Sequence, residues 1–347
     1  MGKLFVKDLR EGDYVKSTFM VSDRSLVNFR DRNGSFLNIT FVDKTGEIPA
    51  VAWENSTEFF KITTPGDVVG VGGVIKVYRS NLQIVVDELW TCNKDEYQIE
   101  DFLPCTTADV EELKEFLLDT ISQIKDGCLR GILEYFFSDE SWVERFMKAP
   151  AAKRMHHDYI GGLAEHTVNV VKLSESVCKL YPNINTDLLL TGAILHDMGK
   201  VDEYIYDCRI DLSDEGRLLG HIAIGQAKID DAIKSFKFFP KELGVALKHM
   251  ILSHHGEYEW GSPKRPKFLE ACILHHVDNL DAQANKFSKI IEEDNDDFDQ
   301  WTSYDQALGR SLYVGVHRMG LYLENESEDE SAASKDSTKR GKTLLEF

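Results

Sequence analysis

The sequence predicts a multidomain protein in which an all-β barrel comes first and an all-α domain follows. Residues 1–92 hold short stretches of alternating apolar and polar residues separated by turn signals, which is typical of strands. From residue 108 onward, apolar residues recur at spacings of three and four, which is typical of amphipathic helices. A chain of 347 residues is long enough for two such domains and a tail.

The N-terminal region carries the signals of a small barrel. Leu37, Ile39 and Phe41 face one way along residues 35–42, and the residues between them face the other. A hairpin signal follows at 43–46, and residues 56–62 predict a short helix. Strands are expected at 35–42, 47–53, 65–78 (one bent strand or a pair) and 82–90. About five short strands with one brief helix before the fourth resemble an OB-fold, and the alternative is a small antiparallel barrel without a ligand.

Aromatic and basic residues would form the binding face of such an OB-fold. The candidates are Phe36, Trp53, Lys76, Tyr78 and Arg79. Taken singly, each is better explained by barrel packing or plain surface than by base stacking. The net charge of −19 argues against broad electrostatic binding of duplex nucleic acid. It leaves open a single strand that stacks on aromatic rings in a local groove.

Changes in composition and the positions of helix- and strand-breaking residues divide the chain further. We expect the barrel at 1–92, a linker at 93–107, the helical domain at 108–322 and a disordered acidic and polar tail at 323–347. Helices are expected at 108–148 with breaks at Gly127 and Ser138–Asp139, at 163–181, at 186–200 with Thr186 as its cap, and at 220–236, 240–254, 266–284 and 301–319. The absence of a long apolar run, of a secretory signal and of paired cysteines predicts a cytoplasmic protein with no membrane segment.

Most of the 11 histidines gather between residues 156 and 276. Their gaps are far too long for a zinc finger, but a helical domain can bring them together in its core. Neutral imidazoles plus carboxylates are the ligand set of a hydrolytic metal site, in which a divalent ion activates water. Any single histidine is more simply a satisfied core or surface residue. The spaced set, with one His-Asp and one His-His doublet, is hard to explain by packing alone.

The positions of these residues suggest how two ions would be held. His196 and Asp197 are consecutive on a predicted helix and point about 100° apart. One of them can therefore complete the shell of a first ion while the carboxylate bridges to a second. His254 and His255 form a similar pair at a predicted helix end, and His166 would point to the core.

Five motifs carry a resemblance to a known family. They are HHDYIGGLAEHT (156–167), HDMGK (196–200), GH (220–221), HHGEYEWGSPKRP (254–266) and LHHVDNLDA (274–282). The order H…HD…H…HH…D is the signature of HD-domain metal-dependent phosphohydrolases. The fuller set resembles the YhaM-type 3′–5′ exoribonucleases, in which an N-terminal OB-fold precedes the HD domain. The resemblance covers residues 1–320, including the domain order, and leaves the acidic tail unexplained.

The resemblance implies two divalent ions per chain. It gives the first ion His166, His196, Asp197 and Asp278, and the second Asp197, His221, His254 and His255, with Asp197 as the bridge. Oxygen and imidazole donors without thiolate favour Mn²⁺, with Fe²⁺ and Co²⁺ as alternatives, and they do not exclude Zn²⁺.

Three further roles follow from the resemblance. Lys200 would reach the phosphate as a fixed cation, with an ordinary surface lysine as the alternative. His157, with His156, would contact the terminal nucleotide or protonate the leaving 3′-oxygen, with structural capping as the alternative. Asp281 would support the ligands or lie on the helix surface. We expect His249, His275, His276 and His317 to be structural, and a role for His275 beside Asp278 stays open.

The implied activity is 3′–5′ exonucleolytic degradation of single-stranded RNA to nucleoside 5′-monophosphates. Single-stranded DNA as a further substrate and a homo-oligomeric state stay open. Small-nucleotide hydrolases are an alternative, but they mostly use the shorter H…HD…D set. Cyclic-dinucleotide phosphodiesterases of the HD-GYP type are another, but GSPKRP stands where their Gly-Tyr-Pro is expected. A non-catalytic single-strand-binding factor with a vestigial HD domain conflicts with the complete ligand set.

Overall fold

The computed structural model describes residues 3–29, 33–79, 81–153, 157–206, 210–294, 300–306 and 308–316. The expected tail, His156 and His317 lie outside these residues. The chain forms two compact units that divide after Ala282, and every candidate metal ligand lies in the first of them. Among the described helices, none is long and apolar enough to cross a membrane.

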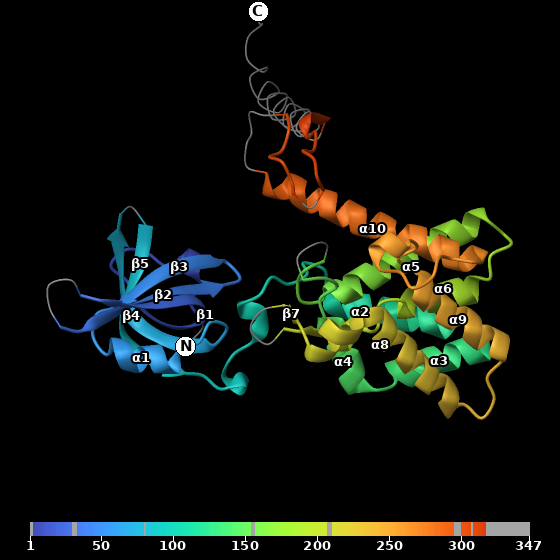
Figure 1. The fold of residues 1–347 in the computed structure, drawn as a ribbon, viewed down its shortest axis with the longest axis horizontal. Coiled ribbons are helices and arrows are strands. Elements are labelled where there is room, and N and C mark those ends of the chain that lie inside the picture. The colour runs from blue at the N-terminus through green and yellow to red at the C-terminus, as the bar shows by residue number, and fades with distance from the viewer. Residues whose placement is uncertain are drawn as a thin grey trace, which may run out of the picture. The chain divides into compact units, whose positions relative to one another are not determined.

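The N-terminal part is a closed five-stranded barrel, which confirms the predicted OB-fold (Figure 1). Its strands are β1 (Tyr14–Asn28), β2 (Ser35–Asp43), β3 (Gly46–Ala52), β4 (Val68–Tyr78) and β5 (Asn81–Thr91), in the spatial order β1-β2-β3-β5-β4. Antiparallel pairing of β1 with β4 closes the barrel, and β3 pairs with β5 in parallel. Helix α1 (Ser56–Ile62) packs against β1, β2 and β5.

The predicted alternation of β2 is confirmed, because Leu37, Ile39 and Phe41 are buried in the barrel core. The glycine-rich stretch that could have been two strands is the single strand β4. Its register with β5 shifts between Gly72 and Gly73, where Asp87 of β5 is the extra residue. A Cβ at Gly70 would collide with the ring of Trp90 on β5. The glycine therefore allows the large indole to cross the neighbouring strand.

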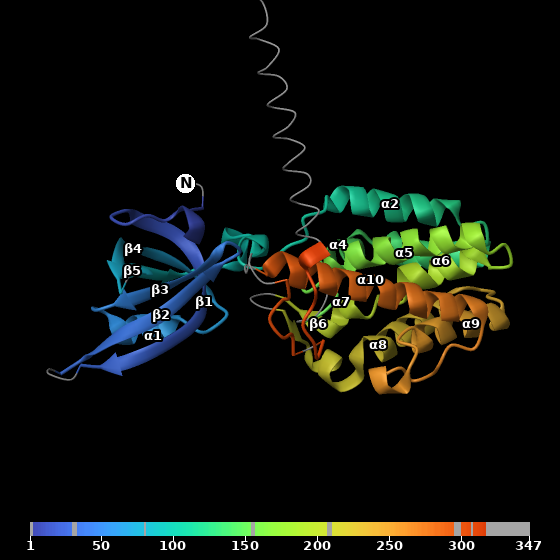
Figure 2. The ribbon, with the colours of Figure 1, turned by 90° about the horizontal axis from the view of Figure 1, so that it is seen from above.

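The helical part is built around two adjacent helices, α5 (Gly162–Leu180) and α6 (Thr186–Leu195), which lie side by side in both views (Figure 2). The other helices are α2 (Val110–Gln123), α3 (Gly127–Phe137), α4 (Glu140–Lys148), α7 (Lys200–Glu203), α8 (Asp214–Ser235), α9 (Lys241–Ser253) and α10 (Leu269–Glu293). Every residue from Leu188 to Leu195 is buried, as expected for a helix that is apolar all round. Helix α6 therefore runs through the middle of the core. The residues that follow Leu195 are for this reason buried inside the domain.

Several predicted boundaries were wrong. Asn185, not Thr186, caps α6, because the Asn185 side chain accepts the N–H of Leu188 at 3.1 Å. Helix α6 ends at Leu195 instead of running on to residue 200, so His196 and Asp197 lie in a turn. The chain between α7 and α8 forms a short hairpin of β6 (Tyr204–Ile205) and β7 (Asp211–Leu212), which no alternating pattern announced.

The last predicted helix, 301–319, was also wrong over its described part before residue 315. Two isolated bridges, Trp301 with Tyr313 and Asp305 with Arg310, hold this segment instead. Gly309 has a φ of +66°, which a helix does not contain. Helix α10 runs to Glu293, nine residues beyond its predicted end at 284, because its amphipathic spacing continues through Ile290 and Ile291.

Candidate metal centre

The centre of the site is the turn that follows α6. His196 and Asp197 have 0% and 2% of their surface exposed, because the buried helix delivers them into the core. Gly199 lies two residues further on, where the chain passes α8. A Cβ at Gly199 would collide with the carbonyl oxygen of His221 and lie 2.8 Å from the nitrogen of Gly225. Glycine at this position lets the turn and α8 meet backbone to backbone.

Four side-chain atoms from three elements form the first group. His166 of α5 and Asp278 of α10 join His196 and Asp197. The Nε2 atom of His166 lies 3.2 Å from the Nε2 of His196, 3.2 Å from Oδ1 of Asp278 and 3.6 Å from Oδ2 of Asp197. The Nε2 of His196 lies 3.3 Å from Oδ2 of Asp197 and 3.8 Å from Oδ1 of Asp278. Donor atoms bound to one ion at about 2.1 Å are separated by about 3.0–3.5 Å, so this group fits a single ion.

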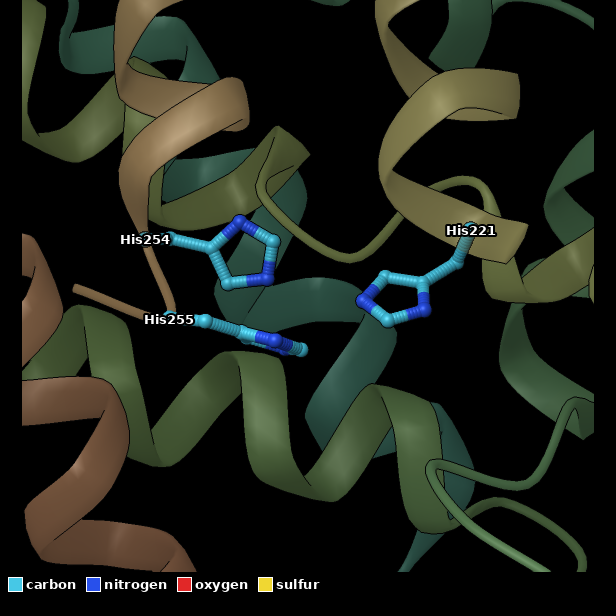
Figure 3. A group of neighbouring side chains, drawn as sticks. All are labelled: His221, His254 and His255. Atoms are coloured by element: carbon cyan, nitrogen blue, oxygen red, sulfur yellow. The ribbon is translucent and has the colours of Figure 1, made fainter. Parts of the chain in front are cut away.

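The second group lies on the other side of Asp197. His221 of α8 and the pair His254–His255 after α9 point their rings toward one another (Figure 3). The Nε2 atoms of His221 and His254 each lie 3.5 Å from Oδ1 of Asp197. One oxygen of Asp197 therefore faces the first group and the other faces the second, which is the arrangement of a bridging carboxylate.

Three buried atoms of the second group have no hydrogen-bond partner among the described residues. They are Oδ1 of Asp197, Nε2 of His221 and Nε2 of His254. A buried polar group left without a partner costs about 1–3 kcal/mol. Three such atoms that converge on one point are satisfied together by a cation, so the residues present fit a second metal ion.

In all five imidazoles, Nδ1 is the ring nitrogen that lies beside a hydrogen-bond acceptor. An N–H at Nδ1 can donate in each case to the oxygen that lies beside it. The acceptors are Asp281 Oδ2 for His166 at 2.7 Å, Ala193 O for His196 at 2.8 Å, Glu203 Oε1 for His221 at 3.1 Å, Ile251 O for His254 at 2.7 Å and Trp260 O for His255 at 3.0 Å. A proton at Nδ1 leaves the Nε2 lone pair for a metal, and this is the usual way in which proteins orient histidine ligands.

Comparisons with known proteins identify a family for the barrel and a family for the helical part of the chain. The HD domain model matches residues 163–283, and an OB-fold nucleic acid binding domain model matches residues 20–91. The 3′–5′ exoribonuclease YhaM of Geobacillus sp. (strain WCH70) is 37% identical over 259 residues, which cover 74% of this chain and 79% of that protein. The chain belongs to the YhaM 3′–5′ exoribonuclease family. The YhaM proteins of Bacillus licheniformis and Bacillus subtilis (strain 168) are 35% and 34% identical over 258 residues, which cover 74% of this chain and 81% of each.

Membership of the YhaM family confirms the resemblance carried by the motifs. HD domains bind divalent metals, and the histidine and aspartate groups of this YhaM-family chain are placed to hold such ions. The second group supplies candidate ligands, His221, His254 and His255, that the shorter H…HD…D set lacks.

The electrostatics of this YhaM-family site leave most of the candidate ligands in the protonation state that a cation requires. Burial by itself raises the pKa of Asp197, but Lys200 and His196 hold that pKa well below its ordinary value. Burial, followed by the neighbouring His254 and His221, lowers the pKa of His255 to about 3. His166 differs, because burial lowers its pKa while hydrogen bonds to Asp278 and Asp281 outweigh this and raise it to about 9. Asp197 is thus ionised and His255 neutral at pH 7, whereas His166 holds a proton until an ion displaces it.

Two predicted catalytic residues lie in different surroundings. Lys200 is 6% exposed, and its Nζ lies 2.6 Å from Oδ2 of Asp197, so it is part of the site and not a surface lysine. His157 is fully buried behind His166, with its ring nitrogens 2.9 Å from Asp281 Oδ2 and 2.8 Å from the hydroxyl of Tyr159. Full burial does not fit the predicted contact of His157 with a terminal nucleotide.

The remaining histidines and one missed carboxylate complete the surroundings. The Nδ1 of His275 donates to the carbonyl of His254 at 2.8 Å, and Nε2 of His249 accepts the N–H of Lys267 at 3.1 Å. Glu203 was not among the predicted site residues. Its carboxylate accepts both the backbone N–H of His221 at 2.8 Å and the Nδ1–H of the same residue. In the sequence, Glu203 is visible only as an acidic residue shortly after HDMGK. Its partner His221 follows a kink in α8 at Gly220, where φ is +73°.

On the barrel, the predicted binding residues form two separate clusters. Phe36 packs with Phe29 and Trp53, with ring centroids 5.5 Å and 5.0 Å away. Lys76, Tyr78 and Arg79 are exposed at the end of β4, and the Arg79 guanidinium lies 5.3 Å from the Tyr78 ring. Phe29 was missed because it lies after the last residue of β1, where no alternation continues.

Proposed function

We propose that this protein is a metal-dependent 3′–5′ exoribonuclease that releases nucleoside 5′-monophosphates from single-stranded RNA. The observation that carries the proposal is the pair of ligand groups that share Asp197, found in a chain whose relatives are named 3′–5′ exoribonuclease. A shared carboxylate between two ions is typical of enzymes that cleave phosphodiesters by in-line attack of water.

The first ion would be held by His166, His196, Asp197 and Asp278, and the second by Asp197, His221, His254 and His255. Donors that are all nitrogen and oxygen favour Mn²⁺, with Fe²⁺ and Co²⁺ as alternatives. When bound, the ions supply Lewis-acid stabilisation of the phosphate and lower the pKa of water.

The chain's own residues supply position and charge. Asp197 orients both groups, since it presents one oxygen to each. The Lys200 ammonium, 2.6 Å from Asp197, offsets the negative charge of the carboxylates and stands ready to pair with a phosphate oxygen. Because Lys200 itself is buried, it approaches a phosphate without reorganising solvent, which strengthens the electrostatic interaction.

The barrel would hold the single strand. Phe29, Phe36 and Trp53 form an aromatic cluster at one edge, and Trp53 is 48% exposed there. A hollow of about 570 Å³ beside Phe29 and Trp53 is also lined by Glu54 and Glu58. Carboxylates repel phosphates, so this surface would take bases by stacking. The cationic Lys76 and Arg79 on the other cluster are suited to the backbone.

The test is an assay of the purified chain with Mn²⁺ and a single-stranded RNA of twenty bases labelled at its 5′ end. A 3′–5′ exonuclease shortens the labelled strand step by step and leaves a circular RNA of the same sequence intact. Immediate release of the label as a mononucleotide, or cleavage of the circle, would contradict the proposal. A DNA strand of the same sequence in parallel determines whether DNA is a second substrate.

A further inference from the structure

A hydrogen-bonded chain runs away from the first metal group into the core. The Oδ2 atom of Asp281 lies 2.7 Å from Nδ1 of His166 and 2.9 Å from Nε2 of His157. The Nδ1 of His157 lies 2.8 Å from the hydroxyl of Tyr159. Four side chains, Tyr159, His157, Asp281 and His166, are thus connected in a row that ends at a candidate ligand.

The protons of this row fit one arrangement that serves a metal. If His166 keeps the Nε2 lone pair for an ion, its proton is on Nδ1 and is donated to Asp281. His157 donates its Nε2–H to the same oxygen, and the Tyr159 hydroxyl donates to the unprotonated Nδ1 of His157. Asp281 accepts two N–H groups on one oxygen, so His157 fixes the rotation of the carboxylate and the carboxylate fixes the ring of His166.

The backbone is strained to put His157 in this place. His157 has a φ of +49°, in the left-handed region that non-glycine residues rarely adopt. A Cβ at Gly162 would collide with the His157 carbonyl oxygen, which accepts the N–H of Ala151 at 3.1 Å. Such a conformation costs about 1–3 kcal/mol and persists where its surroundings determine it. A fully buried histidine cannot act on substrate, so this strain points to a role behind the ligand.

The second group is supported differently. Glu203 contacts His221 directly through two hydrogen bonds from its backbone N–H and Nδ1–H. His166 donates its Nδ1–H to Asp281, and Asp281 accepts on that same oxygen from His157 as well. The orientation of Asp281 therefore depends on a second partner, and His157 provides it.

We propose that Asp281 and His157 are positioning residues of the first metal group, and that together they set the affinity of that group for its ion. The inference rests on the proposed function only in taking the first group as a metal site. The same three side chains, His157, His166 and Asp281, are also close enough to hold an ion themselves. Separations of 2.7 and 2.9 Å to one shared oxygen are those of hydrogen bonds, which favours positioning over a third ion.

The experiment is a calorimetric titration of the chelator-stripped full chain with Mn²⁺. Asp281→Ala should weaken one of two binding events by roughly 10–100-fold and leave the other unchanged, which is the usual effect of losing a partner of a histidine ligand. Asp281→Asn should weaken it less, because an amide oxygen can accept both N–H groups without the charge. His157→Phe, which keeps a planar ring but cannot donate, should weaken the same event on the order of tenfold.

The matched control is Glu270→Gln on the same helix, α10. Glu270 accepts the backbone N–H of Asn185 at 2.7 Å, away from the ligands, and its variant should bind Mn²⁺ as the unmodified chain does. A high Mn²⁺ concentration should restore kcat in the Asp281 and His157 variants to within a few-fold, which a general loss of packing would not allow.

Two outcomes overturn the inference. One is wild-type Mn²⁺ affinity in folded Asp281→Ala. The other is a stoichiometry of three ions that falls to two in that variant, which would make the row a metal site. If Asp281→Ala does not fold, wild-type affinity in Asp281→Asn and His157→Phe overturns it equally. An unmodified chain that binds Mn²⁺ but leaves RNA intact contradicts the proposed function alone.

Discussion

Replacing Asp197 with asparagine tests the shared carboxylate most directly. Asparagine keeps the shape of the side chain, but one of its two positions becomes an NH₂ group. One of the two ligand groups then faces a donor where it had an acceptor, and both groups lose a negative charge. Since Oδ1 lies 3.5 Å from two imidazole nitrogens and Oδ2 lies 3.3 Å and 3.6 Å from two others, neither orientation of the amide preserves both sites.

The expected loss follows from the number of ions retained. Losing one ion removes several kcal/mol of charge stabilisation in the transition state. About 4 kcal/mol corresponds to a decrease in turnover of roughly 10³-fold. The measurement is the rate of shortening of the 5′-labelled RNA at saturating Mn²⁺, together with circular dichroism to verify that helix content is unchanged.

The matched control is Asp202→Asn, five residues further along the chain. Asp202 lies on α7 and pairs with Arg145 and Lys228, outside both ligand groups. Its variant loses a partly buried, ion-paired carboxylate near the site and should keep turnover within a few-fold. Turnover of Asp197→Asn at the level of this control would refute the assignment of Asp197 as a bridging ligand.

Three further results are expected. Elemental analysis of protein purified without chelator should approach two metal ions per chain, and a value that never exceeds one under Mn²⁺ loading would remove the second site. Trp53→Ala should weaken binding of a ten-base RNA by roughly 5- to 150-fold in fluorescence anisotropy, since stacking is worth about 1–3 kcal/mol per base. Tyr135→Ala, at a similarly exposed aromatic residue of α3, should not weaken it. Mn²⁺ affinity should rise about tenfold per pH unit below pH 9, because the ion must displace the proton that His166, with its pKa of about 9, carries in the metal-free protein. Calorimetry in buffers of different ionisation enthalpy would detect that proton, and an affinity independent of pH between 6 and 8 would show that His166 is not protonated.

The spacing of apolar residues along the sequence predicted the buried face of a strand and the presence of a buried helix. The alternation of Leu37, Ile39 and Phe41 identified the inner face of β2, since side chains of a strand alternate between faces whatever it packs against. The apolar run of α6 was also recognisable, because a helix that is apolar on all sides is expected to be buried. Its end was misplaced, because His196 and Asp197 are residues that a helix can contain, and the turn they form is followed by the close packing of Gly199 against α8.

In the candidate site, the candidate ligands could be predicted from the sequence, but most of the residues that hydrogen-bond to them could not. Residue types and doublets are visible in the sequence, and the family resemblance singled out His166, His196, Asp197, His221, His254, His255 and Asp278 as candidate ligands, which the structure places close together. Partners that act across the fold could not be named in this way. Glu203 reaches His221 only through the kink at Gly220, and the burial of His157 depends on its left-handed backbone. No spacing rule encodes either contact, because each depends on how separate elements dock.

The contact between Gly199 and α8 has a consequence for how this centre can vary. The turn that carries His196 and Asp197 approaches α8 at His221 and Gly225 through main-chain atoms, with no side chain of Gly199 between them. The distance between the turn that carries Asp197 and the helix that carries His221 is therefore set by contact between two backbones. It does not depend on the size of a side chain between them. Ordinary substitutions around the site can exchange one donor atom for another, and so change which ion is preferred. A change in the spacing of the two halves would instead require a displacement of α8, which carries His221, or of the end of α9, which precedes His254.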